Sequence, residues 1–362
     1  GRRDASTSYV RDGETGEILH TNTSDIGTFA YARNAAYDDG GGLIFVRAGT
    51  YDFGGSGLGG RNKVSWKGEG QQVTIVIGSS IFYSGNNSFV SYMGFTTYLY
   101  PGYNTTVSNV EITHTSSNSV KGDEVTFSHV TFNGCYIDCV QHQNLTITNC
   151  VFRDGQNGII NLGDNSIVSE NRFYDLTYTG TRVKGDNVAV TSNVFVNAGT
   201  YGDVGYGPIV VTSGDDILVS SNVVNGANST GISIYSQSNP VRNCEVSNNL
   251  IENATPYGIR LCGYVVDLIN TTVCNNKIFN SDYGINITKA YGGNVYNTII
   301  RANVFSNNAN GAINDGGTNT IITPDNVIDG KLCTQTGVAT IANDEYVAHG
   351  IDSSLNIAQS NS

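Results

Sequence analysis

Asparagine recurs at one place along the second half of this chain. Each of the seven asparagines is followed two residues later by an apolar residue, and the intervals between them are 22, 29, 27, 27, 27 and 23 residues. The set is Asn171, Asn193, Asn222, Asn249, Asn276, Asn303 and Asn326. A period of this size predicts a solenoid in which each repeat is one supersecondary unit. We expect the amides to stack on neighbouring coils and to hydrogen-bond to turn backbone.

A second repeat runs beside the asparagine ladder with the same period. Glycines precede short apolar strands at Gly158, Gly180, Gly207, Gly231, Gly258, Gly284 and Gly311. Upstream, Val110, Val130 and Cys150 occupy the place of the asparagine, so the ladder is expected to begin at Asn171. Strands of three to five residues with alternating inward apolar positions are predicted in every coil.

The two ends of the chain lack the repeat that defines the coils. Residues 1–23 are polar and unpatterned, which predicts an extended arm. Ser24 and Asp25 offer an N-cap, and helical spacing follows from Ile26 to the stop at Asp38 and Asp39. A short helix there would cover the exposed apolar end of the solenoid. The coils are predicted to run over 24–330, and 331–362 to form a tail or the start of a small β domain.

Composition limits the possible partners. The net charge of −12 with only 14 % charged residues gives no basic footprint for nucleic acid. A polyanion must be captured by local bases or by a metal. No apolar run is long enough to span a membrane. Sequons allow a secreted setting and stand at Asn22, Asn104, Asn144, Asn228, Asn253, Asn270 and Asn286.

Seven cysteines occur, without a C-x-x-C pair of the metal-binding type. Buried thiols are favoured, with one or two disulfides as the alternative.

The N-terminal stretch resembles a known superfamily. Phe29–Ala36, Gly40–Val46 and Ala48–Tyr51, followed by the coils, are similar to the pectate-lyase-like right-handed parallel β-helix superfamily over roughly residues 24–330. The resemblance implies an all-β, single-stranded right-handed parallel β-helix with an N-terminal capping helix. Such proteins include secreted polysaccharide lyases, hydrolases and epimerases, and also viral tailspikes and adhesins, so the site must decide the function.

In this architecture glycans usually lie along the outer face of one parallel sheet. Aligning the coils places Ile159 with Thr181, Asn161 with Val183 and Leu162 with Lys184. The Gly-Ile-x-Ile pattern then points Arg182 and Lys184 outward. These cations could neutralise a uronate carboxylate. The alternative is a solvated pair offset by Asp186 and Glu170. Asn161 and Arg260 are further candidates for substrate binding.

The segment Gly134–His142 is the densest cluster of titratable groups, and Tyr136, Asp138 and His142 could supply an acid and a base. It resembles the Tyr-x-x-Asp-Pro-His stretch of mannuronan C5-epimerases and related alginate lyases, which implies catalytic roles for these three residues. The spacing differs at both steps and the proline is missing. In the alternative interpretation Asp138 bonds a turn and His142 is an ordinary turn residue.

Two further patterns have structural alternatives. Gly-Asp-Asn or Gly-Asp-Asp recurs with Asp164, Asp186 and Asp215, which could bind Ca²⁺ or could serve tight turns. No other cofactor is expected. Eight aromatic residues between Phe82 and Tyr103 could stack on sugar rings, and half or more are expected to fill irregular coils.

The sequence therefore predicts a secreted carbohydrate-active protein, a lyase or C5-epimerase acting on a uronate-containing polysaccharide. Arg182 and Lys184 would hold the carboxylate, and His142 or Tyr136 would take the C5 proton. The rival is a non-catalytic glycan-binding adhesin, tailspike-like protein or structural rod at a cell or virion surface. The third hypothesis is a hydrolase using Asp138 with Asp186 or Asp215. The expected partner is a polysaccharide or surface glycan, and an oligomer is possible, a trimer if the chain is tailspike-like.

Overall fold

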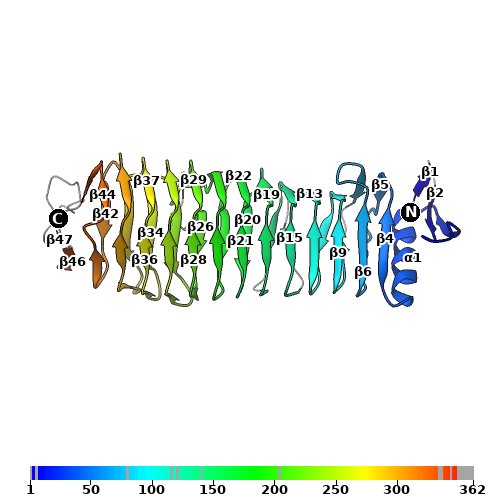
Figure 1. The fold of residues 1–362 in the computed structure, drawn as a ribbon, viewed down its shortest axis with the longest axis horizontal. Coiled ribbons are helices and arrows are strands. Elements are labelled where there is room, and N and C mark those ends of the chain that lie inside the picture. Colours follow the sequence, from blue (N-terminus) through cyan, green and yellow to red (C-terminus); the bar gives the residue numbers. More distant parts are fainter. Residues whose placement is uncertain are drawn as a thin grey trace. The chain divides into compact units, whose positions relative to one another are not determined.

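The computed structural model describes residues 2–4, 7–78, 81–114, 117–119, 122–139, 142–202, 205–332, 337–342 and 345–348. The chain divides into two compact units, Gly1–Gly155 and Gln156–Ser362. Within each unit successive coils place their strands in parallel register (Figure 1). The predicted all-β parallel β-helix is confirmed.

The N-terminal segment is a small antiparallel sheet of β1 (Arg2–Asp4), β2 (Thr7–Arg11) and β3 (Ile18–Asn22). Tyr9 and Val10 are each only 9 % exposed, and the rings of His20 and Tyr31 stack with centroids 4.2 Å apart. The prediction of an unpatterned extended arm is therefore wrong. Its few apolar side chains are enough to pack this sheet against the helix that follows.

Helix α1 (Asp25–Asp38) begins and ends as the sequence predicts. The Ser24 hydroxyl accepts a hydrogen bond from the Gly27 amide at 3.3 Å, which satisfies one free donor of the first turn. Phe29, at 3 % exposure, lies against the rings of Tyr51 and Trp66 at 5.2 and 5.3 Å. The helix thus covers the apolar end of the first coils.

The first unit stacks its strands into parallel ladders in which apolar residues alternate inward. One ladder is β4 (Gly42–Val46), β6 (Val64–Gly68), β9 (Ser88–Ser91), β12 (Thr105–Ser108), β15 (Thr126–Ser128) and β18 (Thr146–Thr148). The next is β5 (Gly49–Asp52), β7 (Thr74–Ile77), β10 (Gly94–Phe95), β13 (Glu111–Thr113), β16 (Thr131–Asn133) and β19 (Val151–Arg153). Shorter ladders pair β8 (Ile81–Tyr83) with β11 (Tyr98–Tyr100) and β14 (Ser117–Ser119) with β17 (Tyr136–Asp138).

The described coils of the second unit form four parallel sheets. We call them the ladder sheet, the third sheet, the long-strand sheet and the short sheet. The ladder sheet holds β22 (Arg172–Leu176), β25 (Val194–Ala198), β29 (Val223–Asn225), β33 (Leu250–Glu252), β37 (Lys277–Phe279), β41 (Val304–Ser306) and β44 (Val327–Ile328). The third sheet holds β21 (Ile167–Ser169), β24 (Ala189–Thr191), β28 (Leu218–Ser220), β32 (Glu245–Ser247), β36 (Thr272–Cys274), β40 (Ile299–Arg301) and β43 (Thr320–Ile322). The long-strand sheet holds β20 (Asn157–Leu162), β23 (Thr179–Val183), β26 (Gly207–Val211), β30 (Ile232–Ser236), β34 (Tyr257–Gly263), β38 (Tyr283–Lys289) and β42 (Gly311–Asp315). The short sheet holds β27 (Gly214–Asp215), β31 (Val241–Arg242), β35 (Leu268–Ile269) and β39 (Val295–Tyr296).

The asparagine ladder forms as predicted, at the entry to each strand of the ladder sheet. Asn222 donates its backbone amide and its Nδ2 to Asn249 Oδ1 at 2.9 and 3.0 Å. Its own Oδ1 accepts the same two bonds from Asn193, and its Nδ2 also donates to the Val190 carbonyl at 2.9 Å. The amide of every coil therefore satisfies buried polar groups that the turn would otherwise leave unpaired.

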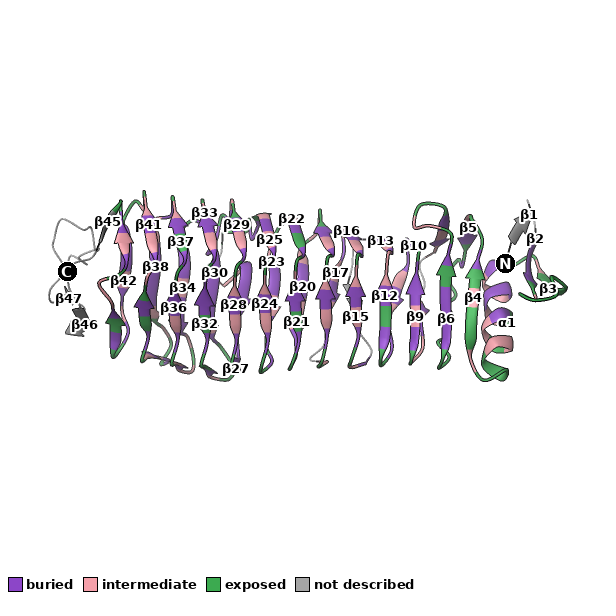
Figure 2. Ribbon diagram, viewed as in Figure 1, coloured by how far each residue is buried: buried purple, intermediate pink, exposed green. Residues whose placement is uncertain are grey.

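Alternation of buried and accessible residues runs through the coils (Figure 2). Several glycines of the predicted row lie where side chains of the ladder sheet approach the backbone. A Cβ at Gly180 would stand 2.5 Å from the ring of Phe195, so only glycine allows this close packing.

The cysteine prediction is confirmed where the structure describes it. Cys135, Cys139, Cys150, Cys244, Cys262 and Cys274 are buried thiols that form no disulfide among the described residues. Burial raises the pKa of Cys150 and of Cys244 to about 12. Among the sequons, Asn286 is buried at 1 % exposure.

After the coils the chain turns back on itself. Strand β45 (Lys331–Leu332) pairs antiparallel with β44, and β46 (Gly337–Ala342) pairs antiparallel with β43 and with β47 (Glu345–Ala348). In the described part of the chain, no helix is both long and apolar enough to cross a bilayer.

Candidate functional site

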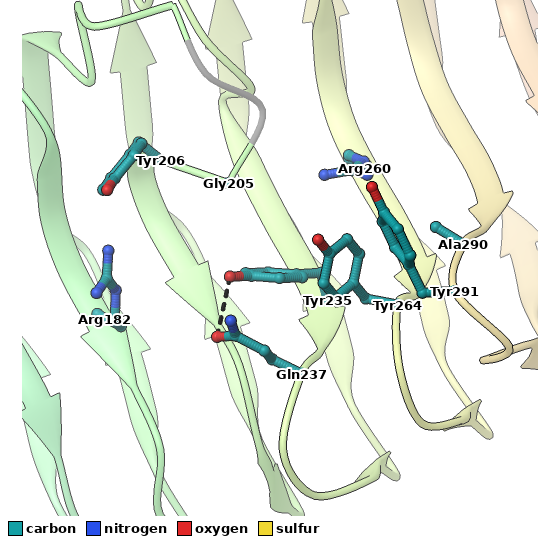
Figure 3. Close-up of a pocket in the computed structure, with 9 residues that line it drawn as sticks. All are labelled: Arg182, Gly205, Tyr206, Tyr235, Gln237, Arg260, Tyr264, Ala290 and Tyr291. Atoms are coloured by element: carbon teal, nitrogen blue, oxygen red, sulfur yellow. Dashed lines mark hydrogen bonds between the residues drawn. The ribbon is translucent and has the colours of Figure 1, made fainter.

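A groove of about 510 Å³ lies in the second unit, over the strands of the long-strand sheet. We call it the arginine–tyrosine groove, and the described residues that line it are Arg182, Gly205, Tyr206, Tyr235, Gln237, Arg260, Tyr264, Ala290 and Tyr291 (Figure 3). Two cations and four phenol rings thus share one surface.

The alternation of the strands positions both arginines. Arg182 stands between Thr181 and Val183, each 0 % exposed, so its own side chain leaves the opposite face of β23. Arg260 stands on β34 between the buried Ile259 and Leu261 in the same way. Register links the two, because Arg182 pairs with Val210, Val210 with Ser233 and Ser233 with Arg260.

Arg182 has donors that the protein leaves unsatisfied. Its Nη2 makes one long hydrogen bond of 3.4 Å to the Thr179 hydroxyl, and its guanidinium lies over the Tyr206 ring at 5.6 Å. Its Nε is buried and has no hydrogen-bond partner. Arg182 is partly exposed, so accessible N–H groups of its guanidinium can donate to an anionic ligand.

Arg260 occupies the other end of the groove. Its Nη2 donates to Cys262 Sγ at 3.4 Å, a weak acceptor, and the residue is only partly buried. Figure 3 shows Tyr235 and Gln237 between Arg182 and Arg260.

The tyrosines form ring contacts along the groove. Tyr264 meets Tyr235 at 5.6 Å and Tyr291 at 4.7 Å, both edge to face. The Tyr235 hydroxyl donates to Gln237 Oε1 at 3.1 Å. Desolvation, and next the neighbouring Tyr291, raise the pKa of Tyr264, so its hydroxyl stays protonated at neutral pH.

A second ring cluster lies beside Arg182. Tyr206 contacts Tyr178 and Tyr201 at centroid distances of 5.1 and 5.6 Å. Phenol rings of this kind offer apolar faces together with hydroxyl groups, the combination that suits sugar rings.

The predicted candidates divide between the groove and other places. Arg182 and Arg260 line one groove, and the outward direction predicted for Arg182 and Lys184 is found. Lys184 is exposed one residue beyond β23, and it is not among the described residues that line the groove.

The predicted alignment at Asn161 is wrong. Leu162, and not Asn161, pairs with Val183, because the register shifts between Ile159 and Leu162. Asn161 adopts a left-handed conformation with φ of 56° at this irregularity, which asparagine tolerates better than most residues. Its role in substrate binding stays a prediction.

Tyr136, Asp138 and His142 belong to the first unit. Tyr136 and Asp138 flank the buried Ile137 on β17, so both leave the same face of the strand. His142 Nδ1 lies 3.0 Å from Asp123 Oδ1, which also accepts the Gln143 amide at 3.0 Å. That backbone bond, and then His142, hold the pKa of Asp123 below its ordinary value.

Asp123 could not be identified from the sequence as the partner of His142, because the two residues stand in different coils. The catalytic roles of Tyr136, Asp138 and His142 stay predictions.

The aspartates proposed for calcium serve stacked turns. Asp164 Oδ1 accepts the Asp186 amide at 2.9 Å, and Asp186 Oδ1 accepts the Asp215 amide at 2.9 Å. Asp215 also faces Arg242 at 3.5 Å. Over the described residues, no cluster of three or more His, Cys, Asp or Glu side chains could hold a metal ion. The turn interpretation accounts for the repeated motif.

The aromatic run of the first unit is more accessible than expected. Of its eight rings only Phe82 and Phe95 are buried. Tyr98 lies on β11 beside Tyr100 and His114, at 6.1 and 4.7 Å. The expectation that half or more fill the coils is therefore wrong, because the β8 and β11 pair turns its tyrosines away from the core.

Most of the groove was missed by sequence reasoning. The available signal was the recurrence of Tyr235, Tyr264 and Tyr291 at intervals of 29 and 27 residues, close to the intervals of the ladder. Tyr206 stands 29 residues before Tyr235 and extends this series, whereas Gln237 has no counterpart at that interval.

Comparisons with known proteins agree on the architecture. The model of a family described as the right-handed β-helix region matches residues 73–244 and 137–295. No curated protein sequence matches the chain.

Among solved structures, the surface adhesin PfbA of Streptococcus pneumoniae is similar, with a TM-score of 0.64, 15 % identity, and coverage of 95 % of this chain and 97 % of that chain. The mannuronan C-5 epimerase AlgE6 A-module of Azotobacter vinelandii gives 0.55 at 16 % identity, covering 84 % and 95 %. The exopolygalacturonase of Thermotoga maritima gives 0.57 at 10 % identity, covering 86 % and 89 %. Identities this low establish the fold and nothing finer.

Proposed function

The chain belongs to the right-handed β-helix family, and on that basis we propose that it binds an acidic polysaccharide across the long-strand sheet, in the arginine–tyrosine groove. The observation that carries the proposal is the pair of outward arginines in one register row, with tyrosine rings between and beside them. Guanidinium groups recognise carboxylates with charge-assisted hydrogen bonds, and the phenol rings would pack against the sugar faces.

Similar structures fit this proposal without deciding it. They include a surface adhesin, an epimerase of mannuronan and a polygalacturonase. The chemistry common to the two named polymers is the uronate sugar, whose carboxylate suits the arginines of the groove. A site at a cell or virion surface, or secretion, remains part of the proposal.

Binding is favoured over hydrolysis by the composition of the groove. Hydrolysis of a glycosidic bond commonly uses a pair of carboxylates, and none of the described lining residues carries one. Proton abstraction beside a uronate carboxylate needs a cation and a base or acid, so lyase or epimerase activity is the second candidate. The Tyr235 hydroxyl, held by Gln237 between the arginines, is the observation that favours it.

Calorimetric titration with polygalacturonate and alginate oligosaccharides tests the binding. Arg182→Ala and Arg260→Ala should each weaken binding about tenfold or more, because a charge-assisted hydrogen bond contributes roughly 1.5–3 kcal/mol. Arg172→Ala is the matched control, since Arg172 is an exposed arginine at the start of β22 on the ladder sheet. Equal affinities for all three variants, or no binding by the parent protein, would refute the proposal.

Activity is followed separately on the same polymers. Elimination creates an unsaturated uronate that absorbs in the ultraviolet, and epimerisation changes the uronate signals in NMR spectra. Tyr235→Phe should abolish either activity while leaving binding nearly intact, because the ring stays in place. Activity that survives in this variant rules out Tyr235 as the proton-transfer group.

A further inference from the structure

The spacing of the two arginines carries information about the ligand, if the groove binds an acidic polysaccharide as proposed. Three strand steps separate Arg182 from Arg260 in their register row. Adjacent strands lie about 4.8 Å apart, so the two positions stand roughly 14 Å from each other. That separation is longer than one sugar ring, so the two cations cannot serve neighbouring carboxylates of one extended chain.

The positions between the arginines are uncharged. Val210 and Ser233 occupy the row itself, and both are 0 % exposed. The residues of the groove that Figure 3 shows between the two arginines are Tyr235 and Gln237. A carboxylate held against this stretch would lose hydration without gaining a cation, which is costly. The net charge of −12 would oppose any further negative charge on the ligand.

Beyond Arg260 the row continues with amides. Arg260 pairs with Asn286, and Asn286 with Asn314, whose Nδ2 donates to Asn286 Oδ1 at 2.7 Å. Along this face a ligand therefore meets a cation, an aromatic and amide stretch and a second cation, with the partly exposed Asn314 amide beyond the buried Asn286. Such a sequence of groups suits hydroxyl or acetamido groups between widely spaced carboxylates.

We infer that the ligand is a heteropolysaccharide in which acidic sugars are separated by at least one uncharged sugar. Each arginine holds one carboxylate, and the uncharged sugar between them packs on Tyr235 and hydrogen-bonds to Gln237. A polymer with a carboxylate on every ring is a poorer ligand of this groove.

The test uses one polymer at two charge densities. Oligosaccharides of polygalacturonate are compared with the same oligosaccharides after chemical reduction of about half of their carboxyl groups to alcohols, at matched length. The sparsely charged set should bind about tenfold more tightly, because it no longer places a carboxylate without a cation partner in the uncharged stretch. Equal or weaker binding of the sparsely charged set overturns the inference while leaving the proposed function in place. Failure of both sets to bind overturns the proposed function itself.

A lysine substitution in the uncharged stretch should reverse the preference for sparsely charged oligosaccharides. Gln237→Lys places a cation in the uncharged stretch, on an exposed residue of the groove wall. It should shift the preference toward the fully charged oligosaccharides, whereas Asn225→Lys, which adds the same charge on the ladder sheet, should not. An unchanged preference in Gln237→Lys contradicts the proposed position of the uncharged sugar.

Discussion

At the scale of single residues, each ladder asparagine between the end members Asn171 and Asn326 bonds to both neighbouring coils. Its amide oxygen accepts two bonds from the asparagine of the preceding coil, and its Nδ2 donates to the next asparagine and to a strand carbonyl. Loss of one side chain therefore leaves the backbone amide and the Nδ2 of the preceding asparagine without an acceptor, in a part of the protein that water does not reach.

Asn222→Ala is expected to destabilise the second unit by roughly 2–4 kcal/mol, because buried donors of Asn193 lose their acceptor. Asn225→Ala is the control, since Asn225 is exposed on the strand that Asn222 precedes and accepts one bond, from Asn253. Thermal or urea unfolding measures both. Equal stabilities for the two variants would contradict the structural role of the ladder.

Asp315 is the clearest titrating group of the second unit. Its side chain is 1 % exposed, Oδ1 accepts bonds from the Gly317 amide and the Thr320 hydroxyl at 2.9 Å, and Oδ2 is buried without a partner. Burial raises its pKa above the ordinary value of 3.8. The folded state therefore favours the protonated carboxyl, and its contribution to stability is complete below about pH 4. That contribution is lost as the pH rises through the folded pKa.

Asp315→Asn should accordingly raise stability at neutral pH by about 1 kcal/mol, because an amide keeps both accepted bonds and bears no charge. The gain should vanish at and below pH 4. Unfolding midpoints at the two pH values measure it, with the exposed Asp186→Asn as the control. A variant less stable than the parent at neutral pH would contradict the raised pKa.

Residue-scale prediction succeeded where a period governed the position. The ladder asparagines and the outward direction of Arg182 follow from spacing alone. The predicted alignment of Asn161 was wrong because one irregularity in β20 shifts the register. No residue type nearby indicates this irregularity in the sequence. Tyr206 shares the interval of the other groove tyrosines, but spacing alone does not show that these rings meet the arginines, and Gln237 follows no such interval.

At the scale of elements, helix α1 ends the first unit by covering its core. The sequence predicted this helix well, since an N-cap, a helical pattern and a glycine-rich stop all agree. The β1–β3 sheet was missed because strands with few apolar residues and polar neighbours resemble an arm. What orders it is contact with the helix, as in the bond between the Ser8 hydroxyl and the Asp25 carboxylate.

Phe29→Ala should destabilise the first unit by about 3–5 kcal/mol, because it empties a site enclosed by Tyr51, Phe53 and Trp66. Tyr37→Ala, on the exposed side of the same helix, should change stability by under 1 kcal/mol. Differential scanning calorimetry compares the two. A small effect of Phe29→Ala would mean that the helix does not seal the core.

At the scale of the whole molecule, the net negative charge limits where an anionic ligand can bind. With 31 acidic and 19 basic residues, the protein repels a polyanion except where arginines are concentrated. The attraction is then short in range and is screened over about 10 Å at 0.1 M salt. Fold class could be predicted because it depends on many repeated residues. The groove could not, because it depends on a few residues from several coils.

Affinity for an acidic glycan should fall severalfold as sodium chloride rises from low to high concentration, since screening weakens the arginine contacts. The fully carboxyl-reduced glycan serves as the control and should show no such dependence. Affinity electrophoresis or calorimetry measures both. Salt-independent binding of the acidic glycan would assign recognition to the tyrosines alone.

The most direct measurement for the central claim is a crystal structure of the protein with a bound acidic oligosaccharide. We predict sugar density in the arginine–tyrosine groove, with one carboxylate at Arg182, one at Arg260 and an uncharged ring over Tyr235. Density on another face of the coils, or a chain in the groove whose carboxylates avoid both arginines, would contradict it.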